Sequence, residues 1–303
     1  MKIKQIEEDF YVEEDFEPRL SEGAYAYFTL KKKGWSTIDA LYEVASKLHI
    51  PFKWLGYCGN KDKKAVTKQY VSGYKINKEQ LEKLKIKDIE IKFLGYGKER
   101  ITLGSNKGNS FSIVVRDLDR EIKVENKRIL NLFDEQRFGI NDMNLKTGKV
   151  IVKGNFKEAC ELLELKADGN DYVGALMKVE KKRLKFCVNA YQSYLWNKVV
   201  SDLKNKYEKV PLVGFLSELD GEIEERYKGI MKEERISKEQ FMIKAIREIA
   251  SEGGERGMFV EPRELEIKWG DDELNIGKKK AIVSFWLPKG AYATHVVREL
   301  LKH

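Results

Sequence analysis

Cysteine, histidine and proline are scarce in this 303-residue sequence, and each scarcity excludes a class of protein. The cysteines lie far apart without a Cys-x-x-Cys pair, so we expect neither a disulfide framework nor an oxidising compartment. Neither they nor the histidines supply the close ligand pairs of zinc or iron sites, so we expect no metal. The residues concerned are Cys58, Cys160, Cys187, His49, His295 and His303. Five prolines, with 42% apolar and 35% charged residues, exclude a disordered chain.

Long apolar runs are also missing. No stretch approaches the ~18 apolar residues of a membrane span, and the N-terminus, MKIKQIEEDF, has acidic residues where a signal peptide is apolar. We therefore expect no membrane association and a cytoplasmic location. The net charge of +8 favours an anionic partner such as nucleic acid, although solubility alone also explains it.

The pattern of apolar residues predicts two kinds of region. Alternation predicts strands at 24–30, 65–74, 89–94, 111–115 and 280–287, and helical spacing with capping signals predicts helices at 36–48, 77–84, 121–138, 155–165, 179–207, 237–250 and from 292. The first half is thus mixed, and a helical segment begins after about residue 147. Because strand returns near the C-terminus, the middle segment has the pattern of a domain inserted into a core.

Four polar clusters are candidates for function. Asp62 lies among lysines in the loop 56–69, where a solvated turn is the ordinary alternative, and a P-loop is excluded because Lys61 stands where a second glycine is needed. The segment 131–139 has phenylalanines that can stack on a base and an arginine that can meet phosphate, unless they are core residues. The loop 103–111 and the helix 183–197 allow similar RNA contacts, with plain loop and packing roles as alternatives.

The order of six segments is more specific than any one of them. They are EDFYVEE at 8–14, GNKDKKAVTKQ at 59–69, GSNKGNSF at 104–111, NLFDEQRFG at 131–139, NAYQSYLWN at 189–197 and LPKGAYATHVVREL at 287–300. Together they resemble the TruD family of tRNA pseudouridine synthases over nearly the whole chain. The resemblance implies an α+β fold: a pseudouridine-synthase catalytic domain with a mixed sheet, residues 1–147 plus 257–303, interrupted by an inserted TRUD domain, 148–256, which is short for the family.

The resemblance also implies an activity and its residues. It implies isomerisation of uridine 13 in the D-arm of tRNA to pseudouridine by a monomer that uses no cofactor and binds tRNA in a basic cleft between the domains. Asp62 matches the catalytic aspartate, which can add to the base or sugar or deprotonate the sugar at C2′. Lys4 matches a lysine that keeps it ionised, Phe133 a ring that stacks on the flipped uracil, and Asn131 an asparagine that fixes the Asp62 loop.

Basic residues in the same segments are the expected RNA contacts. They are Lys61, Lys63, Lys107, Arg137 and Arg183. If the segment around Asp62 is extended, the two neighbouring lysines point away from the carboxylate and toward phosphates. An RNA-binding protein that has lost catalysis is the competing hypothesis. A tRNA methyltransferase would need a glycine-rich cofactor loop after its first strand, and the sequence shows none.

Overall fold

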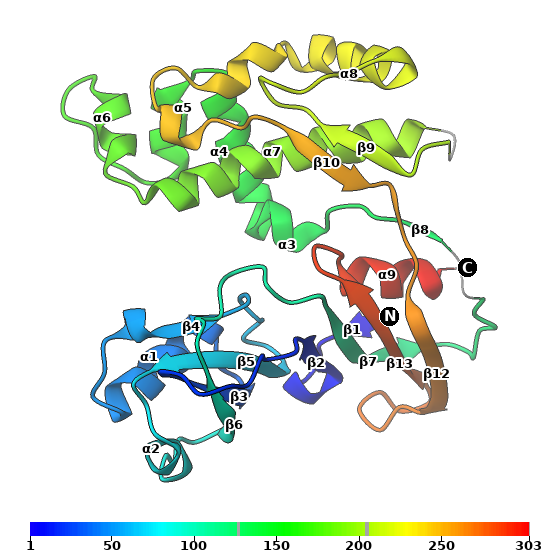
Figure 1. Cartoon of the computed structure of the whole chain (residues 1–303). Helices are drawn as coiled ribbons and strands as arrows, with labels where there is room; N and C mark the ends of the chain where they lie inside the picture. The colour runs from blue at the N-terminus through cyan, green and yellow to red at the C-terminus, as the bar shows by residue number, and fades with distance from the viewer. Residues whose placement is uncertain (126–127, 204–205, 303) are drawn as a thin grey trace. The chain divides into compact units, whose positions relative to one another are not determined.

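A computed structural model describes residues 1–125, 128–203 and 206–302. The chain divides into two compact units: unit 1 is Met1–Lys127 with Glu261–His303, and unit 2 is Arg128–Val260 (Figure 1). Strands dominate unit 1 and helices dominate unit 2, which makes the fold α+β. Within the described residues, no helix combines the length and apolar character needed to cross a membrane.

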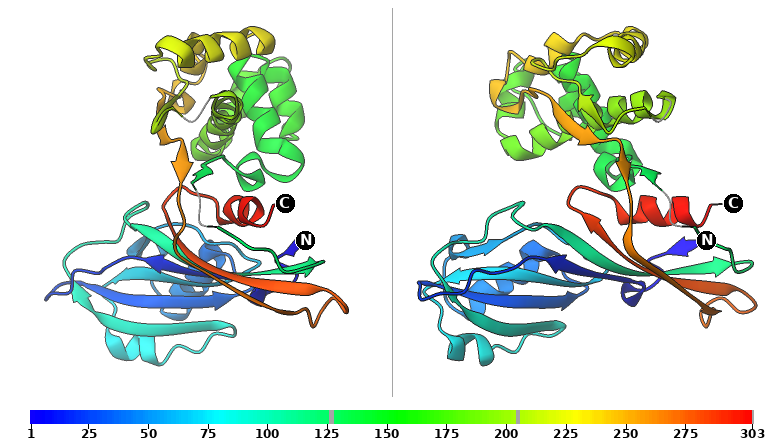
Figure 2. Two further views of the ribbon diagram at one scale, coloured as in Figure 1. Left: turned by 90° about the vertical axis from the view of Figure 1, so that its right-hand side faces the viewer. Right: turned by 45° about the vertical axis from the view of Figure 1, so that its right-hand side comes forward.

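Unit 1 is built on one mixed sheet. Its order is β12-β13-β7-β2-β5-β3-β6, with β1 on β7 and β4 on β5, and β2 runs parallel to β5 while the other pairs are antiparallel (Figure 2). The strands are β1 (Lys2–Ile3), β2 (Phe10–Asp15), β3 (Tyr25–Lys33), β4 (Leu55–Tyr57), β5 (Val66–Tyr74), β6 (Ile89–Gly97), β7 (Gly108–Leu118), β12 (Arg263–Asp271) and β13 (Lys279–Pro288). Because β13 pairs with β7, the C-terminal strand rejoins the N-terminal sheet.

Three α-helices of unit 1 follow predicted positions: α1 (Thr37–Lys47), α2 (Lys78–Glu82) and α9 (Ala293–Leu300). Ser36 caps α1 by accepting a hydrogen bond from the backbone N–H of Asp39. The buried side of α1 packs in one apolar cluster with Phe28 and Leu30 of β3. Short 3₁₀ turns η1 (Glu7–Asp9) and η2 (Phe52–Trp54) precede β2 and β4. Packing of α1 against the sheet thus fixes the start of this helix next to β3.

Unit 2 is a helical bundle around α7. The helices are α3 (Glu135–Phe138), α4 (Met143–Val152), α5 (Phe156–Leu162), α6 (Tyr172–Met177), α7 (Lys181–Asp202) and α8 (Gly221–Glu234). Two small ribbons pair β9 (Lys209–Leu212) with β10 (Gly254–Gly257) and β8 (Ile129–Leu130) with β11 (Phe259–Val260). The backbones of α4 and α7 approach closely at Gly148, where a Cβ atom would lie only 1.9 Å from the Cys187 carbonyl oxygen.

Two predicted helices are wrong. In place of a helix over 121–138, the described residues form β8 and the single turn α3, while 126–127 lie outside the described residues. The segment is extended because its backbone bonds to remote partners: Asn131 N–H to the Met258 carbonyl and Phe133 N–H to Asn197 Oδ1. In place of a helix over 237–250 there are 3₁₀ turns, η4 (Lys238–Met242) and η5 (Arg247–Ile249), separated by Ile243 at a φ of +43°.

Unit 2 begins and ends differently from the expected inserted segment, 148–256. It starts at residue 128 and ends at 260, because β8 pairs with β11 and because α3 and α4 pack on α7. The segment 131–139, expected in the core domain, therefore belongs to unit 2. The predicted helix over 179–207 is α7, which ends at Asp202; residues 204–205 lie outside the described part.

Candidate active site

Asp62 lies in the loop that joins β4 to β5. Buried side chains hold this loop from inside unit 1. Thr37, the first residue of α1, accepts a hydrogen bond from the Lys61 N–H at 2.8 Å and donates to Gln69 Oε1 at 2.8 Å. Gln69 in turn donates to the Gly59 carbonyl at 3.4 Å. The loop backbone is therefore tied to both α1 and β5.

Lys4 forms an ion pair with Asp62 through Nζ and Oδ2. The two side chains are 22% and 29% exposed, so a substrate can reach them. Lys4 Nζ also lies 3.9 Å from the centre of the Phe10 ring, a cation–π contact. The backbone of Lys4 is left-handed, with a φ of +59°, a conformation that non-glycine residues rarely adopt and that is often found at functional sites.

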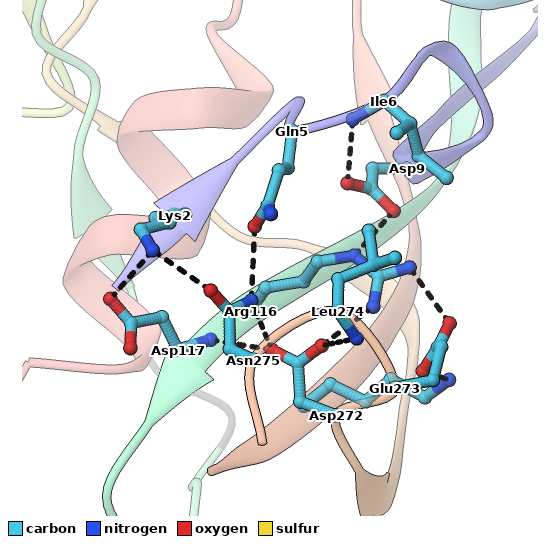
Figure 3. Close-up of polar contacts among 11 residues, drawn as sticks. Lys2, Gln5, Ile6, Asp9, Arg116, Asp117, Asp272, Glu273, Leu274 and Asn275 are labelled. Atoms are coloured by element: carbon cyan, nitrogen blue, oxygen red, sulfur yellow. Dashed lines mark hydrogen bonds and ion pairs between the residues drawn. The ribbon is translucent and has the colours of Figure 1, made fainter.

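A buried arginine fixes the segment that follows Lys4 (Figure 3). Arg116 of β7 pairs with Asp9, Asp272 and Glu273 at 2.8 to 3.0 Å. Asp9 also accepts from the Ile6 N–H at 3.1 Å. From the turn between β12 and β13, Asn275 donates to Gln5 Oε1 at 3.0 Å and to Asp272 Oδ2 at 2.8 Å. Through Gln5, Ile6 and Asp9 the network thus anchors the segment that follows Lys4, and no sequence pattern predicted it.

Two further charged groups lie under the Asp62 loop. Lys32 is 1% exposed and donates from Nζ to the carbonyls of Trp35, at 2.6 Å, and Asp62, at 3.1 Å. Burial lowers the pKa of Lys32 to about 8, although the nearby Asp62 charge raises it in part. Glu14 is fully buried and pairs with Lys61 Nζ at 2.6 Å while accepting from the Tyr70 N–H at 3.0 Å. Sequence reasoning missed the roles of Lys32 and Glu14.

This arrangement changes the interpretation of Lys61. Its side chain is 10% exposed and pairs with Glu14, in place of the phosphate contact predicted from the sequence. Lys63 is exposed, as is Lys107, which lies 3.5 Å from Glu17 across the surface. Lys63 and Lys107 are therefore accessible to a large anion, and Lys61 supports the loop.

Asn131 and Phe133 belong to unit 2, so they form a second group, described separately from Lys4 and Asp62. Arg256 of β10 donates to Asn131 twice, from Nε to the backbone carbonyl at 2.9 Å and from Nη2 to Oδ1 at 2.7 Å. Asn131 Nδ2 donates to the Gly257 carbonyl at 3.2 Å. Asn131, expected to fix the Asp62 loop, thus has its described bonds inside unit 2.

The ring of Phe133 lies among cations and another ring. The guanidinium carbon of Arg256 is 4.0 Å from its centre, and Trp196 meets it edge-on at 5.6 Å. Arg137 lies 5.5 Å from the Phe133 ring and 4.8 Å from that of Phe186, which is 40% exposed. Sequence reasoning missed Arg256, and no spacing signal links it to residues 125 positions earlier.

Arg137 and Arg183, the expected RNA contacts of this unit, differ in setting. Arg137 is half-buried and donates from Nε to Ser193 Oγ at 3.1 Å, so it is held against α7. Arg183 is exposed on the first turn of α7. Among the described residues of the chain, no group of three or more histidine, cysteine, aspartate or glutamate side chains is placed to hold a metal ion.

Comparison with known proteins places this geometry in a family. The family model for tRNA pseudouridine synthase D (TruD) matches residues 1–163, 161–210 and 204–300, almost the whole chain. The chain belongs to the TruD family. A tRNA pseudouridine synthase D from Aquifex aeolicus is 29% identical, with 99% of this chain and 98% of that protein covered. A probable tRNA pseudouridine synthase D from Methanosarcina acetivorans is also 29% identical, covering 99% and 92%.

A TruD crystal structure from Methanosarcina mazei has the same fold, with a TM-score of 0.77, 25% identity and coverage of 99% of this chain and 93% of that one. The alignments with the two relatives run over 384 and 411 positions, more than the 303 residues of this chain, so the TruD relatives carry residues that it lacks. The matched segments meet at 161–163 and 204–210, both inside unit 2.

Proposed function

We propose that this member of the TruD family isomerises uridine 13 of tRNA to pseudouridine and that Asp62 is the catalytic residue. The observation that carries the assignment is the ion pair between Lys4 and a partly exposed Asp62 on a loop that buried side chains hold. Isomerisation breaks the bond between N1 and C1′ and forms one between C5 and C1′. N1 gains a proton and C5 loses one, so the reaction needs acid–base or nucleophilic chemistry and no oxidant.

Each residue of the pair has a part in this chemistry. Asp62 as a carboxylate can add to the base or the sugar, or remove the C2′ proton, and it can take the C5 proton at the end. Lys4 places a positive charge and a charge-assisted hydrogen bond on the Asp62 carboxylate. The cation–π contact with Phe10 helps to keep the ammonium in place when RNA enters.

Unit 2 supplies the residues that we propose bind the base. Phe133 can stack on a uracil that has left the tRNA helix, and extrusion costs a few kcal/mol that stacking and phosphate contacts offset. Arg256 fixes the Asn131 backbone two residues before this ring and lies over the ring itself. We propose that Lys63, Lys107, Arg137 and Arg183 contact RNA phosphates. We also propose that unit 2 corresponds to the inserted TRUD domain and that the enzyme acts as a cytoplasmic monomer.

Tritium release from a tRNA transcript carrying 5-tritiated uridine tests the proposal. The native protein and the control Asp39→Asn, an exposed aspartate on α1, should release tritium, and Asp62→Asn should bind tRNA without release. A transcript with cytidine at position 13 should give no release. Release by Asp62→Asn would exclude Asp62 as the catalytic group. No release by the native protein would leave RNA binding without catalysis, and release from the cytidine-13 transcript would assign another target.

A further inference from the structure

Lys32 is an unusual residue for the middle of a sheet. It follows Ala26, Phe28 and Leu30 on the inward face of β3, and all three are fully buried. Its neighbours in register are Thr67 of β5 and Ile89 of β6. Burying an ammonium among such residues is costly, and lysine is among the residues least often found fully buried. A lysine at this place needs a reason.

Its hydrogen-bond partners suggest that reason. Both are backbone carbonyls: that of Trp35, just before α1, and that of Asp62 itself. Lys4 pairs with the Asp62 carboxylate, whereas Lys32 bonds to the backbone carbonyl of the same residue. A charged donor makes a stronger hydrogen bond to a carbonyl than a neutral one does. The ammonium therefore links the start of α1 to the peptide that carries the proposed catalytic carboxylate.

We propose that Lys32 is a positioning residue for the reaction: its buried ammonium holds the Asp62 carbonyl and so fixes the direction in which the Asp62 carboxylate points. This inference rests on the proposed role of Asp62. Displacement of a reacting group by about 1 Å can cost about 100-fold in rate, so a small shift of the Asp62 carboxylate after loss of the Lys32 bond would be visible in kcat.

The charges that surround Lys32 make the proposal testable by pH. Asp62 and Lys61 face Lys32 from the loop, and Lys61 is itself paired with Glu14. On the β6 side, Asp88 and Glu90 line the surface pocket that adjoins Lys32. Burial outweighs the attraction of Asp62 and lowers the pKa of Lys32 to about 8. The strong donor is therefore lost in a range in which kcat/KM is measurable.

The experiment measures kcat, kcat/KM and tRNA Kd for the native protein, Lys32→Met and the control Lys31→Met between pH 6.5 and 9.5. Lys31 lies on the same strand with its side chain exposed near Glu90. We expect Lys32→Met to lower kcat about 10-fold to 100-fold, with an unchanged tRNA Kd and a melting temperature that is not lowered. We also expect the native kcat/KM to fall above about pH 8, as it does when a free-enzyme group titrates, and this fall to be absent from Lys32→Met.

Each other outcome overturns the inference. Native kcat in Lys32→Met, a loss confined to tRNA binding, or a fall above pH 8 that persists in Lys32→Met would exclude a positioning role. If Lys32→Met does not fold, the native profile decides, because a flat kcat/KM up to pH 9.5 contradicts the proposal. Asp62→Asn, measured in parallel, separates the two levels: its activity would refute the proposed function, whereas its inactivity beside an unaffected Lys32→Met refutes only this inference.

Discussion

Unit 1 is expected to become more stable as the pH rises from 7 to 10, because the buried Lys32 side chain loses its charge. Burial lowers the pKa of Lys32 to about 8 in the folded chain, against 10.5 ordinarily. Between these values the unfolded chain binds a proton that the folded chain does not, and stability rises with pH wherever that holds. At pH 7 the buried charge costs the folded state about 3 kcal/mol, and by pH 10 most of this cost has gone.

Substitution by methionine isolates this contribution. Lys32→Met also removes two hydrogen bonds, but any change in their strength when the ammonium loses its proton is already part of the folded-state pKa of Lys32. The free energy of unfolding of the native protein relative to Lys32→Met should therefore increase by about 2 to 3 kcal/mol from pH 7 to pH 10. The control Lys31→Met should follow the native protein.

Urea unfolding followed by tryptophan fluorescence measures this difference. Four of the five tryptophans lie in unit 1, so the signal reports mainly on the unit that contains Lys32; they are Trp35, Trp54, Trp269 and Trp286. If the native and Lys32→Met curves stay parallel across the pH range, Lys32 carries the same charge in the folded and unfolded chain. The buried ammonium would then not be a cost to the fold.

Three further predictions concern other parts of the chain. Lys4→Met should lower kcat in the tritium assay about 100-fold or more, because it removes the charge beside Asp62 while leaving tRNA binding nearly intact; a change in Kd alone would contradict this. Arg256→Lys should lower the single-turnover rate about 10-fold, since an ammonium cannot bond twice to Asn131 and lie flat on a ring; unchanged rates would exclude a role for the guanidinium. Burial opposes ionisation of Asp272, but hydrogen bonds from Asp117, Asn275, Leu274 and Arg116 outweigh it and hold its pKa below the usual range. Its contribution to stability should thus be present above about pH 4 and be lost as the pH falls further. Urea unfolding of the native protein and Asp272→Asn measures this contribution. The free energy of unfolding of the variant should be about 3 kcal/mol lower than that of the native protein at pH 7, and much of this difference should be gone near pH 2.

The strands were predictable because alternation reports directly which side of a sheet is buried. The pattern located β3, β5, β7 and β13 within a few residues, and Ser36 with Asp39 located the start of α1. The segment 121–138 misled because its apolar residues are spaced as in a helix, while its backbone bonds to Asn197 and Met258, far along the chain. Local spacing contains no information on such partners, and tertiary contacts override it.

The candidate site also contains some residues that the sequence predicted and others that it did not. The ordered motifs led to Asp62 and Lys4, and the structure brings these two together. Arg256 carries no signal in the sequence, because its meaning depends on a ribbon that pairs residues 254–257 with 209–212. Lys32 did carry a signal. Alternation that starts at Ala26 continues to Lys32 on the buried face of β3, but a lysine between two lysines is easily taken for a solvated strand end.

The polar residues under the Asp62 loop show where stability and activity should oppose each other. Thr37, Gln69, Glu14 and Lys32 are all buried, and apolar residues at these positions would avoid the cost of removing polar groups from water. Their hydrogen bonds and ion pair converge on a few residues of one loop, and all four reach that loop directly, from β2, β3, α1 and β5. A satisfied buried network rigidifies what it contacts. We therefore expect joint apolar replacement of these four residues and of Lys61, which leaves no partner charge unpaired, to spare or stabilise the fold while slowing the reaction. A variant of this kind that stabilised unit 1 at full kcat would show that Asp62 needs no such support.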